Sequence, residues 1–276
     1  MLLQLKKCSR FTWMVCVFTT LISFMGIFMN DFYRDNDLIK SVWRGNDVIT
    51  LFIALPLLLF SMRQVLKNPS KHIKLLFVWM GCLWYMIYNY VFYVYGAAFN
   101  IFFLGYILII VASTLGLLHG LLAIKKEIPH IISENNLQRS YKGTSIFLLF
   151  FGTFIGGMWI ALSASFLFTG VVPTAITQTD HPTGVVFASD LIFLVTPLIL
   201  LSYYVSKKNI WAIILTPIIL VKCSLYPLVL VVAGIFAYIE TGYYDVLTPF
   251  YLLLGSGAAY VLLTILRRLT YETASH

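Results

Sequence analysis

The sequence contains few charged residues for its length. Only 11% of its 276 residues are Asp, Glu, Lys or Arg, whereas 60% are hydrophobic and the mean hydropathy is +0.89. An ordinary soluble domain has about 25% charged residues. The shortage of charge excludes a water-soluble globular domain and indicates a protein of the lipid bilayer.

Motifs for several common reactions are missing. The four cysteines have no CxxC spacing, which argues against disulfide exchange and thiolate-bound metal. The sequence also has no histidine pair at helical spacing for haem or zinc, no GxSxG motif for a serine protease, and no Walker motif for a nucleotide. We therefore expect no metal and no cofactor.

Long apolar runs recur from one end of the chain to the other. Runs such as residues 101–110 are apolar on every face, which fits a membrane helix and not the alternating strand of a barrel. We predict an all-α bundle, a single transmembrane domain over residues 1–276 with about eight spans. The expected spans are 11–29, 48–62, 75–96, 98–123, 146–170, 186–206, 210–238 and 247–266.

Basic residues are distributed unevenly between the two sides of this predicted bundle. All 19 Lys and Arg residues lie on the side of the N-terminus except Arg34, Lys40, Arg44 and Lys222. Because Lys and Arg concentrate in cytoplasmic loops, both termini are expected in the cytoplasm, with the protein in the cell membrane. This distribution also accounts for the net charge of +8, so we expect no nucleic-acid partner.

Two of the spans share a sequence pattern. Residues 56–68 and 197–209 have Pro, two Leu, Ser, Lys and Asn in register, and each segment follows an Asp near the start of its span. The two spans are four apart in the predicted order. This spacing suggests a parallel four-plus-four duplication.

Two ionisable residues lie inside neighbouring apolar spans. Asp190 and Lys222 flank the short polar turn 206–209, and their Cα levels differ by about 6 Å at the helical rise. A charge in hydrocarbon is costly, so such residues usually face a partner or a functional site. Pro217 and Pro227 on either side of Lys222 each remove a helical hydrogen bond and favour a kink.

A polar stripe in the third span lies at a similar depth. Tyr85, Tyr88 and Asn89 share one face of that helix, and Asp47 begins the second span. We expect these groups to line a cavity that opens at the outer side of the bundle. The predicted ligand or ion-pair residues are Asp47, Tyr88, Asn89, Asp190, Lys222 and Tyr226.

Three functional classes remain open. The polar site could bind or transport a small molecule or an ion. Asp190 and Lys222 could instead form a structural pair in a membrane subunit. In an intramembrane enzyme, Lys222 could act as a base or a Schiff-base nucleophile.

Several short strings resemble those of an uncharacterised bacterial family of multi-pass membrane proteins. They are Gly45-Asn46-Asp47, Tyr88-Asn89-Tyr90-Val91-Phe92-Tyr93, Phe99-Asn100, and Asp190 followed by Leu220-Val221-Lys222. The resemblance covers most of the chain. It implies a bacterial inner membrane and no particular chemistry.

Overall fold

The computed structural model describes residues 1–29, 32–131 and 140–269. Within these ranges the regular structure is helical, and eight helical spans are long and apolar enough to cross a membrane, as predicted. The first four are α1 (Leu2–Phe28), the broken span α2 (Asp37–Ile49), η1 (Thr50–Ala54) and α3 (Leu55–Lys67), then α4 (Ile73–Gly96) and α5 (Phe103–Ile131). The last four are α7 (Lys142–Thr169), the broken span α9 (Val185–Asp190), η2 (Leu191–Val195) and α10 (Thr196–Ser206), then α11 (Ile210–Thr241) and α12 (Thr248–Arg268). A short helix α8 (Thr174–Thr177) precedes α9.

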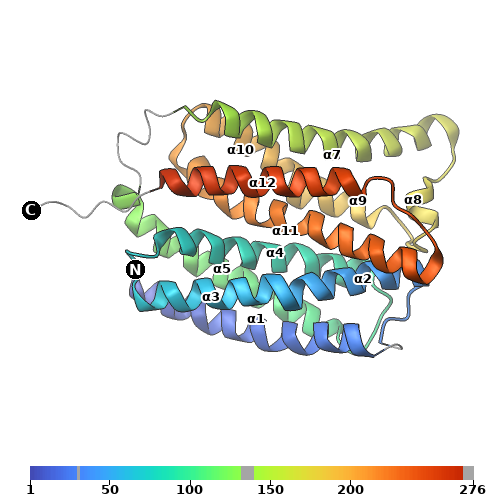
Figure 1. Ribbon diagram of the computed structural model, residues 1–276, viewed down its shortest axis with the longest axis horizontal. Helices are drawn as coiled ribbons and strands as arrows, with labels where there is room; N and C mark the ends of the chain where they lie inside the picture. The colour runs from blue at the N-terminus through green and yellow to red at the C-terminus, as the bar shows by residue number, and fades with distance from the viewer. Residues whose placement is uncertain (30–31, 132–139, 270–276) are drawn as a thin grey trace, which may run out of the picture.

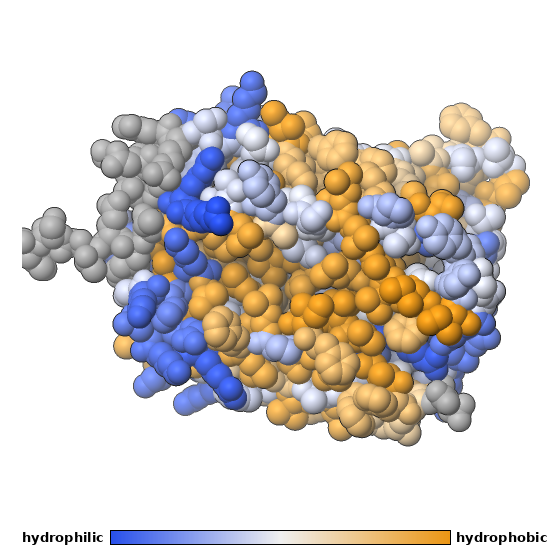
Figure 2. All heavy atoms as spheres, viewed as in Figure 1, coloured by the Kyte–Doolittle hydropathy of each residue, from blue (hydrophilic) through white to orange (hydrophobic). Residues whose placement is uncertain are grey.

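The spans run side by side along the long axis of the molecule (Figure 1). The start of α1 and the end of α12 lie at the same end of the bundle, as an even number of crossings requires. Apolar side chains cover the middle of the molecule, and hydrophilic side chains gather at its two ends (Figure 2). This banding is that of a multi-pass membrane protein. Arg139, one of the basic residues used to predict the orientation, lies outside the described ranges.

Helices α4 and α11 form the centre of the bundle. In the most apolar 18-residue stretch of each helix, 89% of the residues of α4 are buried but only 22% of those of α7. Helix α7 therefore lies at the periphery. Helix α4 packs against α3, α5 and α11, while α11 also packs against α2 and α12. Gly81 allows α4 to approach α11 closely, because a Cβ atom there would lie 2.5 Å from the Cβ of Val221. Polar residues on these two helices are therefore buried.

Both broken spans contain a short π-helix at the same place in their shared pattern. Segment η1 is followed by Pro56 and η2 by Pro197, each at the start of the next α-helix. Proline has no backbone N–H, so it removes one hydrogen bond of the regular α-helix. The wider π-turn before each proline tolerates this loss. The two π-helices occupy corresponding positions in the alignment, while the duplication itself stays a prediction.

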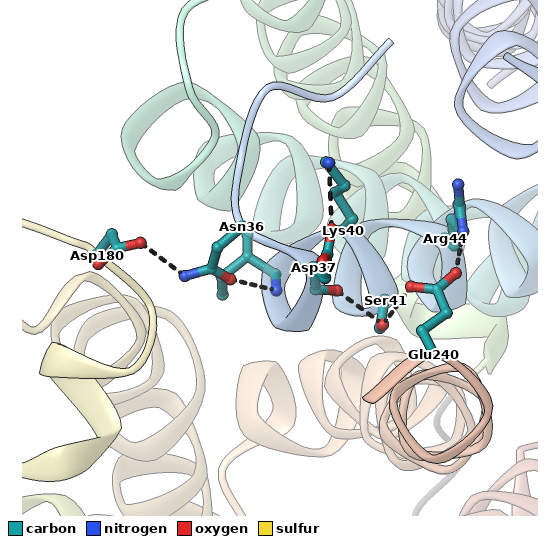
Figure 3. A network of polar contacts seen from close by, with 8 residues as sticks. Asn36, Asp37, Lys40, Ser41, Arg44, Asp180 and Glu240 are labelled. Atoms are coloured by element: carbon teal, nitrogen blue, oxygen red, sulfur yellow. Dashed lines mark hydrogen bonds and ion pairs between the residues drawn. The ribbon is translucent and has the colours of Figure 1, made fainter. Parts of the chain in front are cut away.

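A polar network at the end opposite the termini joins α2 to α11 (Figure 3). Asn36 caps α2 by accepting a hydrogen bond from the backbone N–H of Ile39, and its Nδ2 donates to Asp180 Oδ2 at 2.8 Å. Ser41 donates to Glu240 Oε2 at 2.9 Å, and Arg44 forms an ion pair with the same carboxylate. The network fixes the start of α2 against the end of α11.

Candidate functional site

The ammonium group of Lys222 lies between two tyrosine rings. Its Nζ is 3.5 Å from the ring centroid of Tyr88 on α4 and 3.9 Å from that of Tyr226 on α11. Lys222 is 0% exposed, and its Nζ has no hydrogen-bond partner in the described part of the chain. A cation over an aromatic face gains about 2 kcal/mol or more when water is excluded. The rings therefore stabilise the charge but leave its N–H donors unused.

Asp190 accepts hydrogen bonds at both of its carboxylate oxygens. The hydroxyl of Tyr88 donates to Oδ1 at 2.5 Å, and the indole Nε1 of Trp159 on α7 donates to Oδ2 at 2.8 Å. Asp190 is 2% exposed. Tyr88 therefore lies between the two charges, with its ring against the ammonium of Lys222 and its hydroxyl on the carboxylate.

Local backbone irregularities place both charged residues. Asp190 is the last residue of α9, directly before η2. Lys222 lies in α11 between Pro217 and Pro227, both of which remain inside the helix. Short π-helices are frequent at functional sites, and prolines within a helix produce kinks. Asp190 therefore lies where its span departs from a regular α-helix, whereas Lys222 lies within a continuous α-helix between two prolines.

A hollow of about 440 Å³ lies beside Asp190 toward the end opposite the termini. Phe187 and Leu191, on either side of Asp190 in sequence, line this hollow. Phe187 stacks on Trp159 with ring centroids 4.3 Å apart. Through this stack, Phe187 connects the wall of the hollow to Trp159, which bonds to Asp190.

A second hollow, of about 570 Å³, lies in the half of the bundle that holds the termini. Residues of α4, α5, α10 and α11 line it, and most of them are apolar. Trp84 and Ile218 belong to its wall, one helical turn before Tyr88 and Lys222 respectively. Along the bundle, the charged site therefore lies between the levels of the two hollows, and neither Asp190 nor Lys222 lines either of them.

Asp47 belongs to a separate polar cluster. The hydroxyl of Tyr33 donates to Asp47 Oδ2 at 2.5 Å, and that of Tyr93 donates to Oδ1 at 3.1 Å. Gly26 of α1 permits the close approach, because a Cβ atom there would overlap the carboxylate. Burial, and then the neighbouring charge of Asp47, raise the pKa of Tyr33 well above its usual range. Tyr33 therefore stays protonated and keeps donating.

The predicted site residues thus fall into more than one group. Tyr88, Asp190, Lys222 and Tyr226 come together around the cation. Asp47 bonds to Tyr33 and Tyr93 instead. Asn89 is 2% exposed, and its Nδ2 has no hydrogen-bond partner among the described residues. A single cavity lined by all six residues stays a prediction.

Sequence reasoning missed several partners of these groups. Trp159 is one tryptophan in an apolar span, and nothing in its spacing marks it as a ligand of Asp190. Tyr93 is the last residue of the string Tyr88-Asn89-Tyr90-Val91-Phe92-Tyr93. In the sequence this string carries only a family resemblance, which does not assign Tyr93 to Asp47. In α1, Thr19, Ser23 and Gly26 recur every three to four residues, and this small-residue stripe could have indicated the buried face of the helix.

No protein family, curated protein or solved structure matches this chain. The structure shows a multi-pass membrane protein with two buried polar clusters.

Proposed function

We propose that the protein binds or transports a small molecule bearing a carboxylate or a similar anionic group, with Lys222 as its main contact. The supporting observation is the fully buried ammonium of Lys222, which has no hydrogen-bond partner among the described residues. A lysine has three donors and no acceptor, so its natural ligand is an anion. Asp190 does not supply that contact directly, because no ion pair joins its carboxylate to Lys222 among the described residues and its oxygens bond instead to Tyr88 and Trp159.

The two hollows support movement of the ligand as well as binding. They lie on either side of the charged site, so a ligand that left Lys222 in either direction would enter one of them. In this proposal the stacked pair of Phe187 and Trp159 closes the outer route. Rearrangement at η2 and at the prolines of α11 exposes the site to one side at a time, as in alternating access.

The orientation in the membrane is part of the same proposal. The basic side chains at the end that holds the termini favour a cytoplasmic location for that end, in the plasma membrane of a bacterial cell. The 440 Å³ hollow then faces outward and the 570 Å³ hollow inward. The variants Tyr244→Cys and Lys207→Cys would test this orientation. Only Tyr244→Cys should react with a membrane-impermeant thiol reagent added to intact cells.

The binding proposal is tested on the full chain purified in detergent. The melting temperature is measured with a panel of small carboxylates and, as a comparison, amines of similar size. A ligand should raise the melting temperature of the parent and of Lys126→Met, an exposed control, but not of Lys222→Met. Exchange of the labelled ligand across reconstituted vesicles then distinguishes transport from binding. Equal stabilisation of Lys222→Met would show that Lys222 is not the contact.

A structural role is the second candidate, because the two charges are almost completely buried. In that case Tyr88 links Asp190 and Lys222 only to fix the packing of α4, η2 and α11. A variant with both Asp190→Asn and Lys222→Met would then support growth of a strain that depends on this protein. Loss of growth with normal folded yield would favour the binding site.

A further inference from the structure

The cluster around Asp47 contains further hydroxyl groups that face one another between α1, α2 and α4. Ser23 of α1 lies beside the carboxylate of Asp47. Tyr90 of α4 lies beside both Ser23 and Thr19, the residue one turn earlier in α1. Thr19 and Ser23 are 0% exposed, and Asp47 and Tyr90 are each 1% exposed.

Three of these hydroxyls lie close to polar neighbours but make no hydrogen bond of normal length and angle. Thr19 Oγ1, Ser23 Oγ and the Tyr90 hydroxyl have no partner in the parts of the chain that the structure describes. Buried polar groups in proteins almost always have a partner, whether protein, water or ion. Three oxygens without a well-formed hydrogen bond, in a cluster that contains one buried carboxylate, therefore point to a ligand that they share.

The carboxylate of Asp47 also has no cationic group beside it in the described part of the chain. The groups that bond to it or lie beside it are the hydroxyls of Tyr33, Tyr93 and Ser23, and none of them is a cation. A buried charge is costly unless it is paired. The ligand that best completes this cluster therefore carries positive charge.

We propose that this cluster binds a monovalent alkali cation. The available groups are all oxygens, which hard cations prefer, and no thiol or imidazole is present to favour a transition metal. One carboxylate balances one positive charge, whereas a divalent ion would leave a net charge buried in the bilayer. Asp47, Ser23, Thr19 and Tyr90 are the ligands. The site is distinct from Lys222 and does not depend on the proposed function.

The test compares the melting temperature of the full chain in NaCl, KCl and choline chloride at equal ionic strength. Binding to the folded state alone should raise the melting temperature in one alkali salt by about 3–8 °C over choline at 10–100 times the dissociation constant. Ser23→Ala and Tyr90→Phe should fold, because each removes a hydroxyl that makes no hydrogen bond of normal geometry, and each should lose most of this rise. Asp47→Asn should lose all of it.

Matched controls separate the cation site from general effects. Ser61→Ala removes a buried serine that bonds to the backbone of its own helix, and Tyr95→Phe alters an exposed tyrosine. Both should keep the full rise, as should Lys222→Met. An equal melting temperature in all three salts would overturn the proposal and leave only water in the cluster. A rise that persists in both Ser23→Ala and Tyr90→Phe would overturn it as well.

Discussion

The link between Asp190 and Lys222 through Tyr88 predicts strong coupling between the two charges. Lys222→Met leaves the carboxylate buried without its nearest cation. Asp190→Asn removes the negative charge nearest to the ammonium of Lys222. The Asn side chain also has a single acceptor oxygen, whereas Tyr88 and Trp159 each bond to a separate oxygen of Asp190. Removal of one partner from a buried charge pair costs about 3–5 kcal/mol, because the other charge stays buried.

The double variant should be more stable than the two single costs suggest. With both charges gone, the remaining cost is one unpaired buried donor, about 1–3 kcal/mol. The coupling energy is then several kcal/mol, well above the deviation of about 0.5 kcal/mol seen for independent sites. For a chain of this size each kcal/mol shifts the melting temperature by roughly 2–4 °C. Each single variant should therefore melt about 10 °C below the parent.

The assay is thermal unfolding in detergent of the parent, both single variants and the double variant. Lys126→Met is the exposed control and should melt like the parent. Tyr88→Phe keeps the ring over Lys222 but removes the hydroxyl on Asp190, so it should weaken the coupling without abolishing it. Strictly additive single effects would refute the link through Tyr88.

Four further predictions concern packing, the surface network and pH. Gly45→Ala should destabilise by about 1–3 kcal/mol, since its Cβ would lie 2.6 Å from the backbone nitrogen of Ala233. Gly157→Ala, with nothing within 4 Å, should instead stabilise α7 by up to about 1 kcal/mol in the same unfolding assay. Glu240→Gln should cost about 0.2–1 kcal/mol through the ion pair with Arg44, with a smaller difference in high salt. Because the pKa of Tyr33 is raised on folding, its stabilisation is complete below about pH 10 and is lost as pH rises further. The melting temperature of the parent should then fall more steeply above pH 10 than that of Tyr33→Phe; parallel curves would contradict this assignment.

The spans were predictable because the bilayer imposes a simple requirement on sequence. A helix that crosses hydrocarbon needs about 20 apolar residues, and this chain has few charged residues to obscure the pattern. The same requirement made Asp190 and Lys222 conspicuous, since each interrupts an apolar run. Hydropathy therefore identified the helices and two of the residues at the charged site.

The rotation of each helix about its axis was not predictable from hydropathy. Depth in the membrane placed Asp47 and Asp190 at comparable levels, but packing directs Asp47 toward Tyr33 and Tyr93 and Asp190 toward Tyr88. Packing also brings Trp159 from the peripheral helix α7 to the carboxylate. Such contacts depend on how side chains of different helices fit together. In a sequence of largely apolar residues, the pattern of residue types does not reveal this fit.

The position of Trp159 on α7 connects the surrounding lipid to the charged site. Helix α7 is the least buried span and packs mainly against α10, yet it supplies one of the two donors to Asp190. Lipid that contacts α7 therefore contacts the helix that supplies the Trp159 donor, whereas the second donor to Asp190, Tyr88, comes from the central helix α4.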